Sequence, residues 1–216
     1  MGRPREHDEL TARALLDAAE RIMVTAGPDA ISVRTVADEA NTTVRAVYSL
    51  FGSKDGLVAA LASKTFRLFD EEIDRLPRTD DPVQDLIELA VTVYRPFVLR
   101  HPSLYRIAYQ RVVPSMQVTK EMRDARRGAV LRMQERLQRL KDAELLGSKT
   151  LPQAVIEYAA MCEGLANIEL RGKKLGIMPE GTEESVWRAA IGTVVHGFSK
   201  PSSGDRAATL LPTTTN

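Results

Sequence analysis

The chain has 216 residues, of which 44% are hydrophobic and 5% aromatic, and its formal net charge at pH 7 is +1. This length and hydrophobic content suit one or two domains with a substantial core. Because Cys162 is the single cysteine, an intramolecular disulfide is excluded. The sequence has no recognisable signal peptide and no apolar run long enough for a membrane span, so we expect a cytoplasmic protein without a membrane partner.

Long segments with an apolar period of 3.6, and the lack of alternating strand patterns, predict an all-α fold. The first helix is expected over residues 14–27. Its core stripe consists of Leu15, Leu16, Ala19, Ile22 and Met23. Before it, Gly-Arg-Pro-Arg at residues 2–5 resembles the core of an AT-hook, whose arginines, here Arg3 and Arg5, would enter a minor groove. The alternative is a frayed basic terminus ahead of a helix that starts near Asp8.

Residues 32–51 predict two short helices around a tight turn. In the first helix, apolar residues recur at i, i+3, i+4 and i+7, and Ser32 can cap the first amides. Asn41 falls where the chain must reverse, and asparagine tolerates the left-handed conformation. Thr43 is then the expected cap of a second helix. The residues expected to face inward are Val47, Leu50 and Phe51, and those expected to face outward are Val44, Arg45, Tyr48 and Ser49.

The outward set suits the major groove of DNA. Arginine can grip a guanine edge with two hydrogen bonds, an aliphatic side chain can pack on a thymine methyl, and hydroxyls or lysine can hold phosphates. The expected roles are base reading by Arg45 with Val44 beside it, phosphate contacts by Thr43, Tyr48 and Lys54, and anchoring of the supporting helix by Ser32 and Arg34. Residues 1–55 contain seven Lys or Arg and nine Asp or Glu. Affinity must therefore come from a few well-placed cations, which would be Arg3, Arg5, Arg34, Arg45 and Lys54.

The same residues resemble the DNA-binding segment of the tetracycline-repressor (TetR) family of bacterial transcription regulators. The equivalent or conservatively replaced positions are Ser32, Val36, Ala37, Ala40, Thr43, Val47, Tyr48, Phe51, Ser53, Lys54, Asp55 and Leu57. With the first helix, the resemblance spans roughly the first third of the chain. Asn41 and Thr42 replace the usual glycine and valine of the turn, and Leu50 replaces a common aromatic residue. The alternative is a helical pair within an all-α protein that does not bind DNA.

Further helices are expected over residues 54–76, 83–100, 102–113 and 115–146. Pro96 lacks a backbone donor and should kink the second of them, which would leave room beside it. The arginines from Arg123 to Arg139 are interleaved with acidic residues, which favours a solvated face over a nucleic-acid surface. An apolar effector pocket is predicted, lined by Phe69, Tyr94, Phe97, Tyr105, Tyr109, Met133, Met161 and Glu163. The alternatives are an ordinary filled core and, for Glu163, an exposed or interface position.

The last two helices, expected over residues 152–170 and 182–198, are apolar over a wide arc, which implies a second buried surface. Small residues that would permit close helix approach are Gly164, Ala189, Ala190, Gly192, Thr193 and Gly197. These helices therefore predict half of an intersubunit four-helix bundle in a homodimer, and the TetR resemblance implies the same arrangement. Segments 94–106 and 164–170 look most like the subgroup with a Trp-His-Gly type C-terminal domain, although Glu163 stands in place of its histidine.

The predicted organisation is a helix-turn-helix DNA-binding domain over residues 1–55, a helical ligand-binding and dimerisation domain over 56–199, and a disordered tail over 200–216. No phosphate loop, nucleophile elbow or metal-ligand spacing of histidines suggests an enzyme, a metal site or a cofactor. Cys162 is expected to be a small buried hydrophobe. We therefore expect a ligand-responsive transcription regulator, most readily a repressor released from an inverted-repeat operator by a small hydrophobic effector. A small-molecule carrier or an interaction-only helical bundle is the competing class.

Overall fold

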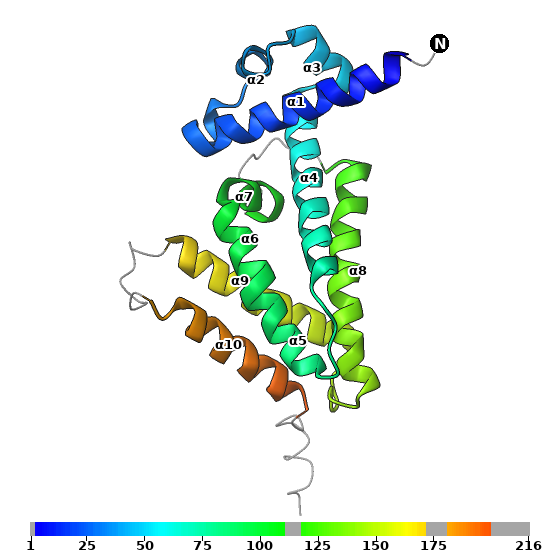
Figure 1. Cartoon of the computed structure of the whole chain (residues 1–216), viewed down its shortest axis with the longest axis vertical. Coiled ribbons are helices and arrows are strands. Elements are labelled where there is room, and N and C mark those ends of the chain that lie inside the picture. Colours follow the sequence, from blue (N-terminus) through cyan, green and yellow to red (C-terminus); the bar gives the residue numbers. More distant parts are fainter. Residues whose placement is uncertain (1–2, 111–117, 172–180, 200–216) are drawn as a thin grey trace, which may run out of the picture. The chain divides into compact units, whose positions relative to one another are not determined.

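The computed structural model of the chain describes residues 3–110, 118–171 and 181–199, and the regular structure in these ranges is helical (Figure 1). The elements are α1 (Arg3–Ala26), η1 (Pro28–Ala30), α2 (Val33–Glu39), α3 (Val44–Phe51), α4 (Lys54–Arg75), α5 (Pro82–Glu88), η2 (Leu89–Tyr94), α6 (Arg95–Arg100), α7 (Pro102–Gln110), α8 (Lys120–Asp142), α9 (Leu151–Arg171) and α10 (Glu183–Phe198). The predicted all-α fold is confirmed. Within the described ranges, no helix combines the length and apolarity that crossing a membrane requires.

The helices form two compact units, each made from two stretches of the chain. The first unit contains Met1–Glu71 and Arg100–Val130, and the second contains Glu72–Leu99 and Leu131–Asn216. Helices α1, α2, α3 and α7 therefore belong to the first unit, while α5, α6, α9 and α10 belong to the second. The domain boundary expected after residue 55 stays a prediction.

The first unit is built around the buried apolar faces of its helices. Leu15 of α1, Val36 of α2, Val47 of α3 and Leu61 of α4 are all 0% exposed. Full burial of such a side chain stabilises a fold by about 1.5–3 kcal/mol. The apolar stripes of these helices thus meet in one core. This packing explains why α2 and α3 are stable although they have only seven and eight residues.

In the second unit, α5, η2 and α6 form one continuous run of helix that packs with α9 and α10, which lie side by side (Figure 1). The Tyr158 hydroxyl on α9 donates a hydrogen bond to the Leu86 carbonyl at 2.7 Å. The Glu169 carboxylate accepts bonds from Arg95 at 2.7 Å and from the Trp187 indole N–H at 2.8 Å. Because these polar groups are largely buried and each has a partner, they set the register of three helices against one another.

The irregular turn of the helix lies just before Pro96 and not at Pro96 itself, where the sequence predicts a kink. Leu89–Tyr94 make a π-helical turn, which ends where the Arg95 N–H donates to the Ala90 carbonyl, five residues back. Pro96 offers no N–H to the carbonyl of Thr92, and its ring would crowd that carbonyl in a regular helix. A wider turn just before the proline relieves both conflicts, so the expected kink takes the form of a π turn.

Two helix starts differ from the sequence-based expectation. α1 begins at Arg3 rather than near Asp8, so the backbone of Arg3 and Arg5 is helical and not an extended arm. Proline fits the first turn of a helix because the N–H that it lacks would have no helical partner there. α8 begins at Lys120 rather than after Pro114. The expected segments at residues 111–113 and 200–216 lie outside the described residues.

Arg136 of α8 forms hydrogen bonds with backbone carbonyls at and just after the C-terminal end of α4. Its side chain is 2% exposed and donates to the carbonyls of Ile73 at 2.8 Å, Pro77 at 3.0 Å and Leu76. Carbonyls at the end of a helix lack helical partners, and the negative end of the helix dipole favours a cation there. Burial lowers the pKa of Arg136, which nevertheless remains a cation at neutral pH.

Arg139, one turn further along α8, holds the segment between α4 and α5. It forms an ion pair with the carboxylate of Asp85, which is 4% exposed and also accepts the Thr79 N–H at 2.9 Å. Burial acts to raise the pKa of Asp85, but the hydrogen bonds from Thr79 and Arg139 outweigh burial, so the pKa lies below its ordinary value. The buried carboxylate is therefore ionised at neutral pH and ties this segment to α8.

Candidate nucleic-acid interface

α2 begins with a reciprocal pair of hydrogen bonds between two side chains and two backbone amides. Ser32 Oγ accepts from the Thr35 N–H at 3.0 Å, and Thr35 Oγ1 accepts from the Ser32 N–H at 2.9 Å. Each bond satisfies an amide that a helix N-terminus leaves without a partner, and a cap of this kind is worth about 1 kcal/mol. The predicted cap at Ser32 is confirmed.

A left-handed residue joins α2 to α3. Asn41 has φ 50°, the conformation expected from the sequence. The Thr42 N–H donates to the Ala37 carbonyl at 2.9 Å and closes α2, and Thr43 Oγ1 accepts from the Ala46 N–H at 3.2 Å and caps α3. Asparagine adopts this conformation more readily than other residues that carry a Cβ, so the turn forms here without glycine.

α3 has one buried side and one exposed side. Val47 is 0% exposed, whereas Val44 and Tyr48 are 38% and 53% exposed. Arg45 and Ser49 are exposed as well, and no described residue forms an ion pair or hydrogen bond with the Arg45 side chain. The exposed face thus presents a guanidinium, two hydroxyls and an aliphatic group, which are the donors and the apolar surface that a major groove can accept.

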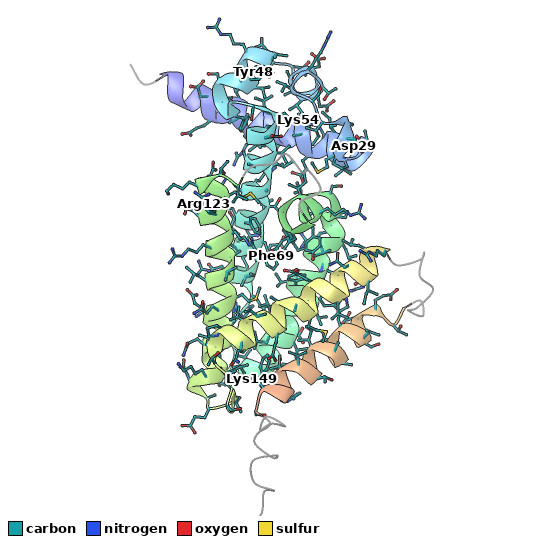
Figure 2. The ribbon with its side chains drawn as sticks, turned by 180° about the vertical axis from the view of Figure 1, so that it is seen from behind. Asp29, Tyr48, Lys54, Phe69, Arg123 and Lys149 are labelled. Carbon is teal, nitrogen blue, oxygen red and sulfur yellow. The ribbon has the colours of Figure 1, made fainter. Side chains whose placement is uncertain are left out.

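Lys54 opens α4 directly after the turn that ends α3. Gly52 adopts φ 74° and donates its N–H to the Tyr48 carbonyl at 2.9 Å. Ser53 Oγ then accepts from the Gly56 N–H at 3.0 Å at the start of α4. Figure 2 shows Tyr48 and Lys54 in the same part of the first unit. Lys54 therefore lies at a helix N-terminus, where the helix dipole also favours an anion such as phosphate.

The remaining predicted DNA contacts are arginines outside α3. Arg34 on α2 is exposed and lies 4.0 Å from the carboxylate of Asp38, and an exposed pair at that distance contributes little energy. Its guanidinium can therefore exchange this partner for another anion. Arg3 and Arg5 belong to the first turns of α1. The DNA-contacting roles of all these residues stay predictions.

Ion pairs link α1 to α2 and to α4 and so hold these three helices together. Arg21 of α1 pairs with Glu39 of α2 at 2.9 Å. Lys64 of α4 bonds to Asp17 at 2.7 Å and to Glu20 at 2.9 Å, both on α1. Burial acts to lower the pKa of Lys64, but the two carboxylates outweigh burial and the pKa is raised. Lys64 is therefore charged throughout the physiological pH range.

The residues predicted to line an effector pocket divide between the two units. Phe69, Tyr105 and Tyr109 belong to the first unit, and Tyr94, Phe97, Met133, Met161 and Glu163 belong to the second. In the first unit, the rings of Tyr105 and Tyr109 stack with centroids 4.8 Å apart. In the second unit, the rings of Tyr94 and Trp187 have centroids 6.1 Å apart. That all eight residues enclose one pocket stays a prediction.

Sequence reasoning missed the polar groups inside the second unit. Arg136 was expected on a solvated arginine face, and this expectation is wrong, because the carbonyls at the end of α4 hold it at 2% exposure. Arg123, Arg126 and Arg127 are exposed, in agreement with the prediction. Glu169 gave a weak signal, since it is a charged residue within an apolar stretch of α9. Its partners lie too far along the chain for any spacing rule to find them.

The described residues contain no group of three or more His, Cys, Asp or Glu side chains that could hold a metal ion. Cys162 is buried, as predicted, and burial raises the pKa of its thiol. A thiol in such surroundings stays protonated at neutral pH, and a protonated thiol is a poor nucleophile.

Comparison with known proteins finds matches to two regions of the chain. Residues 15–61 match the family model described as bacterial regulatory proteins of the tetR family, and residues 87–199 match the tetracyclin repressor-like C-terminal domain. The chain is 34% identical over 76 residues to the HTH-type nicotine-responsive transcriptional repressor HdnoR of Paenarthrobacter nicotinovorans. That match spans 35% of this chain and 38% of the relative's length.

Solved structures share the fold over nearly their full length. A protein of unknown function from Rhodococcus sp. RHA1 superposes with a TM-score of 0.75 at 22% identity, covering 88% of this chain and 96% of the other. A TetR family transcription regulator from Marinobacter aquaeolei VT8 superposes with a TM-score of 0.65 at 19% identity, covering 88% and 97%. Since the C-terminal model alone spans more than half of the chain, and the N-terminal model covers the helix-turn-helix, this chain belongs to the TetR family of DNA-binding transcription regulators.

Proposed function

We propose that the chain is a repressor that binds an inverted-repeat operator in double-stranded DNA as a homodimer and leaves it when a small hydrophobic effector binds. The exposed face of α3, with Arg45 unpaired among the described residues and Tyr48 53% exposed, is the observation that carries the proposal. The capped turn before α3 supports it, because a base-reading helix must be held rigidly. The partial relative HdnoR is a repressor that responds to a small molecule, which favours the same kind of response here.

In this proposal the residues around α3 divide into base readers and phosphate contacts. Arg45 donates to a base edge, and Val44 packs beside it against an apolar group such as a thymine methyl. Thr43, Tyr48 and Lys54 hold phosphates, with Ser49 on the same exposed face, while Ser32 and Arg34 position α2. Phosphate contacts set the register on the duplex, and only the base contacts carry sequence information.

Two substitutions separate these roles. Arg45→Ala should relax the preference at one position per half-site by ~1–3 kcal/mol, which site selection from a randomised duplex measures. Lys54→Ala should weaken binding to all sequences alike and reduce the slope of affinity against salt by about one. Arg126→Ala is the matched control, because Arg126 is an exposed arginine of the same unit that lies on α8. An unchanged preferred site in Arg45→Ala would refute the base-reading role.

The homodimer is proposed to form through α9 and α10. Ile156 and Ile168 on α9 are 67% and 40% exposed in the single chain, and the small residues Ala160 and Gly164 lie between them at four-residue spacing on the exposed side. An apolar stripe with small residues at its centre permits two helices to approach closely. A twofold pair of such surfaces presents two reading heads to the two halves of a palindrome.

Glycine substitutions test the dimer without disturbing the single chain. A Cβ added at Gly164 or Gly197 would meet no atom within 4 Å, so a longer side chain can start at either position in a monomer without a clash at its Cβ. Within the proposed interface, the same arginine would be an unpaired buried charge and should prevent association. Gly128→Arg is the control, since Gly128 on α8 is equally unobstructed. Sedimentation at micromolar concentration should give a dimer for wild type and control. A dimeric Gly164→Arg protein would refute this interface.

The effector is proposed to bind the residues already predicted for it, from Phe69 to Glu163, and to favour a state that does not bind DNA. Linkage then requires that operator DNA weakens effector binding by the same factor. Hydrophobic compounds that raise the melting temperature should therefore release the operator in a mobility-shift assay. Stabilising compounds that leave DNA affinity unchanged would show that the residues that bind them are not the regulatory site. A protein that binds no inverted repeat from its own upstream region would instead be a small-molecule carrier.

A further inference from the structure

A cavity of about 270 Å³ lies in the first unit between the C-terminal end of α1, the turn that follows it and α7. The cavity is lined by Met23, Val24, Gly27, Pro28, Ser103 and Arg106. None of these residues belongs to the predicted effector pocket or to the predicted DNA contacts, so the cavity is a separate feature of the molecule.

The polar groups of this cavity come from α7. Arg106 is exposed, and within the described part of the chain its guanidinium has neither an ion pair nor a hydrogen bond. The Ser103 hydroxyl donates to the Met23 carbonyl at 3.4 Å, which is long for a hydrogen bond from a hydroxyl. The hydroxyl can therefore turn toward a better acceptor. The cavity thus offers two donor groups, one of them charged, to a ligand that carries an anionic oxygen.

The wall contributed by α1 and the following turn is aliphatic. Met23 is 1% exposed, whereas Val24 is 62% exposed, so a ligand that covered Val24 would remove its apolar surface from water. Pro28 adds a rigid ring. Gly27 has φ 83° and ψ 173°, a conformation that is nearly restricted to glycine, and nothing lies within 4 Å of where a Cβ would be. The space therefore reaches the backbone at this turn.

We propose that this cavity binds a small aliphatic carboxylate. The carboxylate would accept two hydrogen bonds from the planar guanidinium of Arg106, with the Ser103 hydroxyl beside it, and the aliphatic part would lie on Met23, Val24 and Pro28. A single cation suits a monoanion better than a phosphate, which carries nearly two charges at neutral pH. The lining contains no aromatic ring, so nothing in it selects a planar ligand. The proposal does not depend on the proposed effector response.

Methionine methyl resonances of the full-length protein provide a direct test, with hexanoate as the probe. Labelled methyl groups report each methionine, and a Met23→Leu spectrum identifies the Met23 signal. Hexanoate should shift this signal saturably, and 1-hexanol, which has the same carbon chain without the charge, should shift it much less. Arg106→Gln should weaken hexanoate binding by about tenfold, the effect of losing a charge-assisted hydrogen bond. Arg126→Gln, which removes an exposed arginine outside the cavity, should leave binding unchanged.

Three results would overturn the proposal. A Met23 signal that does not move in millimolar hexanoate would exclude binding at this cavity. Equal shifts with hexanol and hexanoate, or an Arg106→Gln variant that binds as tightly as the wild type, would show an apolar cavity without recognition of an anion. Shifts confined to Met133 and Met161 would place hexanoate at the proposed effector residues, which would remove this site and leave the proposed function untouched.

Discussion

Replacing Arg136 with methionine tests how much the end of α4 depends on its arginine. Methionine cannot donate, so the carbonyls of Ile73, Leu76 and Pro77 lose their charged donor. The bond to Ile73 is buried, while the other two are partly open to water. A buried bond from a charged group is worth ~1.5–3 kcal/mol and the two others about 0.5–1 kcal/mol each. Relief of the buried charge offsets part of this sum. We expect a net destabilisation of about 2–3 kcal/mol.

Urea unfolding at one fixed protein concentration measures this loss as a lower midpoint at an unchanged slope. Arg136→Lys, which keeps a charge but has a shorter reach and no planar fork, should fall between wild type and Arg136→Met. Arg126→Met should change the free energy of unfolding by less than about 0.5 kcal/mol, because Arg126 is exposed. If Arg136→Met were as stable as the wild type or more so, the burial of the guanidinium would outweigh its hydrogen bonds, and the reasoning would be refuted.

Three further substitutions test local features. Thr43→Ala removes the cap of α3 and should lower the free energy of unfolding by ~1 kcal/mol, and Thr43→Ser should restore it. Equal urea midpoints for the wild type and both variants would contradict the role of the cap. Asp85 has a lowered pKa in the folded state, so its stabilising effect is complete above pH ~4 and is lost as the pH falls through the folded-state pKa. Asp85→Asn should therefore be destabilised most at neutral pH, with a gap to wild type that closes in acid; a constant gap from pH 7 to 3 would argue against it. Glu144 follows α8 with φ 59°, a left-handed conformation that strains a residue with a side chain. Glu144→Gly should therefore raise the free energy of unfolding by about 0.5–1 kcal/mol. A lower urea midpoint for this variant would show that Glu144 is not strained.

The features that the sequence predicts well are those that act over a few residues. Ser32 and Thr43 each cap an amide three residues ahead, and Asn41 adopts its left-handed conformation at the reversal itself. Each depends on residue type and order alone, so no tertiary information is needed. The two faces of α3 follow from periodicity in the same way, with Val47 buried and Tyr48 exposed.

The features that could not be predicted depend on partners far along the chain. Arg136 bonds to a carbonyl 63 residues away, and Arg95 meets Glu169 at a separation of 74 residues. In the sequence, Arg136 is indistinguishable from the exposed arginines that precede it on α8, because its partners are backbone carbonyls and carry no residue signature. The effector residues pose the same problem, since whether aromatic side chains fill a core or line a pocket depends on packing and not on spacing.

The π turn at Leu89–Tyr94 has a consequence for how this protein can tolerate changes in length. A π turn contains one residue more than an α turn, and α-helical residues are set about 100° apart around the axis. The π turn takes up this extra residue, so the helix beyond it keeps the direction that a regular helix with one residue fewer would have. Deleting one residue here would therefore leave Arg95 close to its present direction, toward Glu169, which also holds Trp187. The cost would fall on Pro96, whose ring would then crowd the carbonyl four residues before it in a regular helix. A single deletion within these six positions should still be tolerated better than a deletion in a regular turn, which would rotate every residue beyond it by about 100°.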